Sequence, residues 1–454
     1  MAKDLIKIRK ISVKKLFGMF DHDIPINKDV GITIVIGENG LGKTILLEMI
    51  ESFFQGKYVY FNSVLFKEFI VEFEDRIKWV IEKKKNTKDG TTSLEVSQVS
   101  KNKRKTKPLK LINLDDDNNK TSLSDIVRNN PYLQRINSQI WEDRRTGEIL
   151  HTDELIHRYR HSYRRRSRHI QSNLLDGAKI PAWFNERHSN IKVKLIETQR
   201  LINLKNNKEK THYKTVEKYS EEITINIKKY LTESTELSSK LDRTYPNRLV
   251  ERLSHSTTHV TDEYLNTNLK KLEEKRALLD AVGLIEIEKD SNILEIDKPA
   301  EDLKDVLMLY LEDSFQKIEI FDEITRKIEL LLKVINKRFK HKTFNVDKEH
   351  GFVFNSTILK DKEGNYISIP VSKLSSGEQN ELVLFYELLF NTTSNSLILI
   401  DEPEVSLHIS WQNSFIEDLK EIATLNKFEV VIATHSPDII SNNWDLKIEL
   451  KGLE

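Results

Sequence analysis

The chain has 454 residues, enough for two or three structural units with a sizeable core. Its 72 basic and 71 acidic residues leave a formal charge of +1, so no overall excess of charge indicates a nucleic-acid or membrane partner. The absence of cysteine excludes disulfides and cysteine-ligated metals, and no apolar run approaches the roughly 18 residues of a membrane span, so we expect a cytoplasmic protein.

The first motif follows a strand near the amino terminus. Alternating or apolar patterns predict strands over 6–13, 20–26 and 32–36, and the last is followed by GENGLGKT and a helical pattern. Strand, glycine-rich loop and helix in this order are typical of a phosphate-binding loop, whose backbone N–H groups surround the phosphates. Lys43 is expected to reach the β- and γ-phosphates, and the Thr44 hydroxyl to ligate Mg²⁺. The residues predicted to bind the nucleotide here are Gly37, Asn39, Gly40, Gly42, Lys43 and Thr44.

The next part of the chain is rich in predicted strands. Segments such as 69–73 and 78–81 alternate between apolar and polar residues. We therefore expect an antiparallel sheet beside the helix of the first motif, with a polar loop at 114–120.

Two runs of basic residues interrupt this neutral chain. Residues 101–110 carry six lysines or arginines and no acid, and residues 157–169 mix arginine, histidine and tyrosine. Such clusters attract phosphate backbones, although a solvated helix face or a docking surface for an acidic protein is equally compatible with them. The predicted DNA or RNA contacts are Arg158, Arg160, Arg164, Arg165, Arg166 and Arg168.

A helical region is predicted from about residue 201 to 340. Apolar residues recur at threes and fours, most clearly over 318–335, and breaks are expected at 245–247 and 298–299. This pattern favours a compact helical insertion or short coiled-coil arm. Turn residues at 347–351 and 361–365 predict hairpins that follow the helices.

Two apolar strands near the carboxyl terminus end in reactive side chains. The segment 396–400 leads into Asp401 and Glu402, and the segment 430–434 leads into His435. Asp401 is predicted to hold Mg²⁺, and Glu402 to take the proton from an attacking water. His435 is predicted to bond the γ-phosphate or that water, although alone it would suit a core position.

Another motif, LSSGEQ, precedes an amphipathic run over 380–390. The Ser375 hydroxyl and the Gly377 N–H lie at a predicted helix N-terminus, which suits an anion. As a helix cap alone, the same residues would need no partner. The predicted nucleotide contacts of this motif are Ser375, Ser376, Gly377 and Gln379.

In this order, the motifs resemble those of ABC-type ATPases of the RecF, SMC and OLD-like class, with LSSGEQ as the ABC signature. The resemblance implies ATP and Mg²⁺ as cofactors. It also implies a head-to-tail pair or higher oligomer, in which the signature of one copy covers the γ-phosphate bound by another. Gln199, at the end of the strand predicted to begin at 191, would be the glutamine that touches Mg²⁺ or water, unless it only starts a helix.

The segments IETQRL, LDRTYPNRL and LSSGEQNELVL further resemble the ATPase subunits of bacterial anti-phage systems of the Septu (PtuA) or PARIS type. That resemblance implies a sensor or regulatory ATPase that controls a partner nuclease of the HNH or Toprim type, because neither nuclease is expected within this chain. The alternatives are a RecF- or SMC-like DNA-binding ATPase of repair or maintenance, and a nuclease whose site is not recognisable. The large helical insertion disfavours a membrane transporter.

The expected fold is therefore α/β: an ABC-type P-loop ATPase head with an antiparallel β-subdomain and an inserted helical or short coiled-coil lobe. The expected segments are 1–200 and 343–454 for the two halves of the head, and 201–342 for the insertion.

Overall fold

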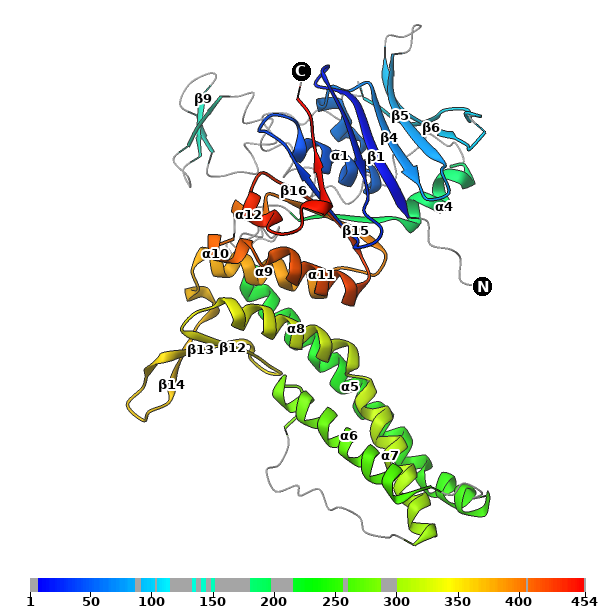
Figure 1. Cartoon of the computed structure of the whole chain (residues 1–454), viewed down its shortest axis with the longest axis vertical. Helices are drawn as coiled ribbons and strands as arrows, with labels where there is room; N and C mark the ends of the chain where they lie inside the picture. Colours follow the sequence, from blue (N-terminus) through cyan, green and yellow to red (C-terminus); the bar gives the residue numbers. More distant parts are fainter. Residues whose placement is uncertain are drawn as a thin grey trace. The chain divides into compact units, whose positions relative to one another are not determined.

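The chain forms two compact units, which are described separately below (Figure 1). One unit contains Met1–Glu197, Thr393–Pro403 and Lys427–Glu454, and the other contains Thr198–Thr392 and Glu404–Asn426. The second unit thus combines the predicted insertion with part of the predicted 343–454 segment. The computed structural model describes residues 7–85, 91–102, 104–114, 133–135, 140–143, 148–151, 180–196, 215–255, 260–286, 300–405 and 407–452.

A parallel sheet of five strands in the order β11-β15-β16-β3-β17 is the centre of the first unit. Its strands are β3 (Ile32–Ile36), β11 (Lys192–Ile196), β15 (Ser396–Asp401), β16 (Glu429–Thr434) and β17 (Lys447–Glu449). The near-continuous apolar sequences of β3, β15 and β16 are typical of strands covered on both faces. Because neighbouring strands are parallel, their carboxyl ends meet at one edge, where Asp401 pairs with Ala433 and Thr434 with Ile36.

The predicted antiparallel sheet is confirmed, with strand order β2-β1-β4-β5-β6-β7. Its strands are β1 (Ile8–Leu16), β2 (Phe20–Pro25), β4 (Glu68–Phe73), β5 (Lys78–Lys85), β6 (Thr92–Val99) and β7 (Leu109–Asn113). Alternate residues of β4 and β5 are buried, as the sequence pattern predicts. A further small sheet has the order β10-β9-β8 and consists of β8 (Leu133–Arg135), β9 (Ile140–Asp143) and β10 (Glu148–His151).

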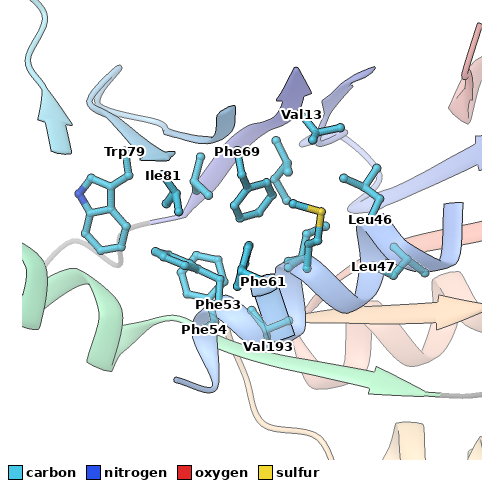
Figure 2. Close-up of a cluster of buried hydrophobic side chains, with 14 of the residues drawn as sticks. Val13, Leu46, Leu47, Phe53, Phe54, Phe61, Phe69, Trp79, Ile81 and Val193 are labelled. Carbon is cyan, nitrogen blue, oxygen red and sulfur yellow. The ribbon is translucent and has the colours of Figure 1, made fainter. Parts of the chain in front are cut away.

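Helix α1 (Lys43–Phe54) joins the two larger sheets through a shared hydrophobic core (Figure 2). Phe53 of α1 lies with its ring centroid 6.0 Å from those of Phe69 and Trp79 on the antiparallel sheet. Val193 of the parallel sheet belongs to the same cluster. Burial of each such side chain contributes about 1.5–3 kcal/mol, so α1 is held firmly beneath the loop that precedes it. Helices α4 (Ala182–Asn190) and α12 (Pro437–Ile440) are the other described α-helices of this unit.

The second unit contains the predicted helical insertion and the predicted hairpins. The insertion consists of α5 (Thr215–His255), α6 (Asp262–Ala281), α7 (Glu301–Glu319) and α8 (Asp322–Arg338), of which α5, α6 and α7 lie side by side (Figure 1). The hairpins are formed by β12 (Lys342–Asp347), β13 (Gly351–Lys360) and β14 (Tyr366–Ile369). Three helices follow them: α9 (Ser376–Phe390), α10 (Ile409–Gln412) and α11 (Phe415–Asn426). No helix in the described part of the chain is long and apolar enough to cross a membrane.

The break predicted at 245–247 is wrong, because Pro246 lies inside the continuous helix α5. Proline removes one helical hydrogen bond and crowds the preceding turn. Here Arg248, two residues further on, donates to both carboxylate oxygens of Asp313 on α7, at 2.6 and 2.8 Å, and to the Leu241 carbonyl. These bonds hold the turn around the proline in place. The break predicted at 298–299 lies outside the described residues, and the next described helix, α7, begins at Glu301.

These features confirm the predicted fold class: an α/β core with the glycine-rich loop after β3, an antiparallel β-subdomain and a helical insertion between β11 and β12.

Candidate functional site

The glycine-rich loop between β3 and α1 has, at two positions, a backbone conformation that favours glycine. Gly40 and Gly42 have φ values of +89° and +85°, in the left-handed region. A Cβ on Gly42 would also lie 2.6 Å from Leu16 Cδ2 and 3.0 Å from Phe17 Cε2. The hairpin of β1 and β2 therefore packs directly against this loop and leaves no room for a side chain.

Lys43 begins α1, and its side chain folds back over the loop. The Lys43 ammonium donates to the Gly37 carbonyl at 2.7 Å and to the Glu38 carbonyl at 3.2 Å, and the residue is buried. A cation held by a loop of turning backbone, at a helix N-terminus, is a suitable environment for phosphate.

The structure brings Thr44 and Asp401 together, although they are far apart in the sequence. The Thr44 hydroxyl donates to Asp401 Oδ1 at 3.2 Å, and Asp401 is buried at the end of β15. A hydroxyl and a carboxylate are the hard oxygen donors that Mg²⁺ prefers beside substrate phosphates. The donor set therefore fits the predicted ion.

Glu402, the next residue, has an unusual backbone conformation. Its φ is +40°, and its N–H donates to the Ala433 carbonyl at 2.8 Å, just beyond the paired ends of β15 and β16. A non-glycine residue in this region stores about 1–3 kcal/mol of strain, and such strain concentrates at functional sites. His435 Nδ1 lies 3.8 Å from Glu402 Oε1, and both side chains are partly exposed. The carboxylate is therefore accessible to water beside an imidazole.

One residue of this site was missed by the sequence analysis. His22 on β2 is buried, and its Nε2 lies 2.8 Å from the carbonyl oxygen of Leu41 in the glycine-rich loop. Burial lowers the pKa of His22 below its ordinary value, so the ring is neutral and Nε2–H is the donor. No local pattern marks such a histidine, because its partner is 19 positions away.

The LSSGEQ segment starts α9 in the second unit, as predicted. Ser375 is the N-cap, and Glu378 closes a capping box with it. A Cβ on Gly377 would meet nothing within 4 Å, so the backbone of this first turn is open to an approaching group. The spacing of Ser375 and Glu378 was a signal for the capping box that the sequence analysis did not use.

Gln379 is buried, and its amide donates to the Leu374 carbonyl at 2.6 Å and the Ser372 carbonyl at 3.3 Å. Its side chain thus holds the loop before α9, and its contact with nucleotide stays a prediction. Gln199 lies outside the described residues. So do the predicted nucleic-acid contacts Arg158, Arg160, Arg164, Arg165, Arg166 and Arg168.

The fold and this site define a P-loop nucleotide-binding protein, with the loop, a buried aspartate and a strained glutamate at one edge of a parallel sheet. Comparison with known families agrees: residues 6–440 match the AAA ATPase domain, so the chain belongs to this family. It is an ATP-binding ATPase.

Among curated proteins, the chain is similar to the Retron Ec83 probable ATPase of Escherichia coli, with 32% identity over 106 residues, 20% of this chain and 19% of that protein. It is also similar to the UvrABC system protein A of Aquifex aeolicus (strain VF5), with 26% identity over 164 residues, 36% of this chain and 15% of that protein. The chain thus spans less than a fifth of the length of these relatives.

Solved structures with a related chain path include two SMC head domains. One is from Thermotoga maritima, with 8% identity, a TM-score of 0.30 and coverage of 96% of this chain and 91% of that one. The other is from Pyrococcus furiosus, with an extended coiled coil and bound to the C-terminal domain of ScpA, with 10% identity, a TM-score of 0.31 and coverage of 96% and 92%.

Proposed function

We propose that two copies of this chain bind ATP between them, each presenting its LSSGEQ segment to the glycine-rich loop of the other. The main support for this proposal is that the motifs are divided between the two units of the chain. The loop, Asp401, Glu402 and His435 share one unit, whereas the open N-terminus of α9 with Ser375 and Gly377 belongs to the other unit. A second anion-binding helix end with an unobstructed glycine is the complement that a γ-phosphate would require.

In this mechanism, the N–H groups of the loop and the Lys43 ammonium bind the phosphates and neutralise the charge that develops on them. Mg²⁺ held by Thr44 and Asp401 would supply further charge neutralisation. Glu402, exposed beside His435, accepts the proton of the attacking water, while His435 orients that water or the γ-phosphate. Pairing accompanies ATP binding, and hydrolysis separates the copies.

The first test removes Lys43 or Glu402. Lys43→Ala should abolish ATP binding, because the loop loses its only cation. Glu402→Gln should bind ATP but hydrolyse it at least about a hundredfold more slowly, since the general base is lost. Light scattering with ATP and Mg²⁺ should then show a stable pair. If Glu402→Gln hydrolyses ATP at the normal rate, Glu402 is not the general base.

At the level of biology, we propose that this ATPase is the sensor or regulatory subunit of an anti-phage defence complex and controls a separate nuclease of the HNH or Toprim type. The order of the motifs and the likeness to the Retron Ec83 probable ATPase support this role. The likeness to the UvrABC system protein A favours the alternative, a DNA-maintenance ATPase.

Binding of duplex DNA by the purified chain separates the two roles. The maintenance role predicts ATP-dependent DNA binding by the chain alone. Neutralising Arg164, Arg165 and Arg166 should then weaken binding and flatten its dependence on salt. The defence role predicts weak DNA binding alone and a nuclease activity that appears only with the partner and changes in Glu402→Gln. Unchanged binding in the arginine variant would exclude these residues as phosphate contacts.

A further inference from the structure

A lysine outside the predicted motifs is bonded to the signature helix. Lys342 is the first residue of β12, and its ammonium lies 2.5 Å from Glu378 Oε1. Both side chains are largely buried, with exposed fractions of 22% for Lys342 and 13% for Glu378. Burial alone would raise the pKa of Glu378, but the bonds from Lys342 and Ser375 outweigh it and hold that pKa below its ordinary value. Glu378 is thus a carboxylate at neutral pH, balanced by one lysine.

The same carboxylate accepts hydrogen bonds from Ser375, the serine that is expected to contact ATP. The Ser375 hydroxyl and the Ser375 N–H both lie 2.9 Å from Glu378 Oε2, to which they donate. The hydroxyl also accepts from the Glu378 N–H at 3.3 Å. A hydroxyl has a single proton, so Ser375 can donate to a phosphate only by releasing Glu378.

This exchange of partners has an electrostatic consequence. When the phosphate arrives, the Glu378 carboxylate loses one donor and gains an anion as a close neighbour. Like charges at such distances repel unless a cation lies between or beside them. Among the described residues, Lys342 is the cation that the structure places on Glu378.

We infer that Lys342 is a positioning residue of the composite ATP site: it neutralises Glu378, so that Ser375 can turn its hydroxyl to the γ-phosphate bound by a second copy. Lys342 itself does not touch the nucleotide. The inference rests on the proposed pairing and adds a residue that the signature motif does not contain. It also gives the charged residue at the fifth position of LSSGEQ a defined partner.

The test measures ATP-dependent pairing of the full chain in the Glu402→Gln background, by sedimentation with ATP and Mg²⁺. Lys342→Met should weaken pairing about tenfold or more, the usual effect of leaving a largely buried charge without its partner. Lys342→Arg should retain pairing. The affinity of the unpaired chain for ATP should not change, because the glycine-rich loop is intact. Lys373→Met is the matched control, since this exposed lysine lies next to the signature, whereas the described ion pair of Glu378 is with Lys342.

A second variant shows whether Lys342 acts by neutralising Glu378, by contacting the nucleotide or by stabilising the fold. Adding Glu378→Gln to Lys342→Met removes the unbalanced charge, so the double variant should pair more strongly than Lys342→Met alone. If the double variant stays as weak, Lys342 contacts the nucleotide or only stabilises the fold, and the inference is overturned. Thermal unfolding of each variant shows whether the fold persists.

The failure of the inference differs from the failure of the proposed function. If the Glu402→Gln chain does not pair with ATP, both are overturned. If it pairs, Ser375→Ala does not, and Lys342→Met pairs as well as Lys373→Met, then only the role of Lys342 is overturned.

Discussion

At the scale of single residues, His22 supports the glycine-rich loop through its hydrogen bond to the Leu41 carbonyl. Its Nε2–H donates to the Leu41 carbonyl, whereas its Nδ1 is buried without a hydrogen-bond partner among the described residues. A buried polar atom without a partner is costly, and the hydrogen bond to the Leu41 carbonyl offsets part of this cost. We predict that His22→Leu lowers ATP affinity about tenfold, because losing one such bond costs roughly 1–1.5 kcal/mol.

His22→Gln is the matched variant for this prediction, since its amide can still donate to the Leu41 carbonyl. Calorimetric titration with ATP should therefore show weaker binding for the leucine substitution than for the glutamine substitution. Equal affinities in both variants and in the unaltered chain would show that the loop does not need this donor.

The same histidine predicts a dependence of stability on pH. Burial lowers the pKa of His22 below 6.5, and burial also lowers that of His188. In the folded chain, the rings of these two histidines thus stay neutral at pH values where the same rings in the unfolded chain already take up protons. This part of the stability is present above pH 6.5 and is lost as the pH falls. Between pH 7.5 and 5.5, the unfolding free energy of His22→Gln, measured by urea unfolding, should fall less than that of the unaltered chain. The fall that remains in this variant should come partly from His188.

At the scale of elements, three helices of the second unit meet at one buried arginine. Arg338 of α8 has its Nε 2.7 Å from Glu381 Oε1 on α9, and its guanidinium donates to Asp418 on α11. The three side chains have exposed fractions of 1%, 0% and 6%, respectively. Burial raises the pKa of Glu381 to about 8. The charge of Arg338 lowers this pKa, and the charge of Asp418 raises it further. Glu381 is therefore protonated near pH 7, and the guanidinium of Arg338 pairs with Asp418.

We predict that Arg338→Leu destabilises the chain by about 3–5 kcal/mol, because the buried Asp418 loses its closest cation and keeps the more distant Lys337, at 3.7 Å. Since the folded-state pKa of Glu381 is raised, its contribution to stability is complete at low pH and is lost as the pH rises toward 8. Glu381→Gln should therefore flatten the fall in unfolding free energy between pH 6 and 8.5. An unchanged pH slope in Glu381→Gln would mean that Glu381 is ionised in the folded chain.

The elements that the sequence predicts well are those that local pattern specifies. The segment 32–36 with its glycine-rich loop, and the strands that end at Asp401 and Thr434, follow from apolar runs and turn residues. The contacts between elements could not be predicted in this way. The bond of Thr44 to Asp401 spans 357 positions and depends on the parallel order of the strands. The helix through Pro246 likewise depends on bonds that Arg248 makes, one of them to another helix.

At the scale of the whole molecule, the net charge is near zero, and lysines at the antiparallel sheet form ion pairs with glutamates. Lys105, from the basic run at 101–110, lies 3.2 Å from Glu82, and Lys84 lies 3.3 Å from Glu95. These exposed pairs favour a solvated sheet face over a phosphate-binding surface at Lys105. Removing Lys105 should therefore change DNA binding little, which a salt titration of binding can check.

The central proposal is that an ATP site requires two copies. Lys43→Ala removes the loop half of the site, and Ser375→Ala removes the signature half, so each variant alone should be inactive. Mixing equal amounts should restore about a quarter of the unaltered ATPase rate, because half of the pairs are mixed and each mixed pair holds one complete site. A mixture as inactive as its two components would contradict the proposal, and so would Ser375→Ala hydrolysing ATP normally by itself.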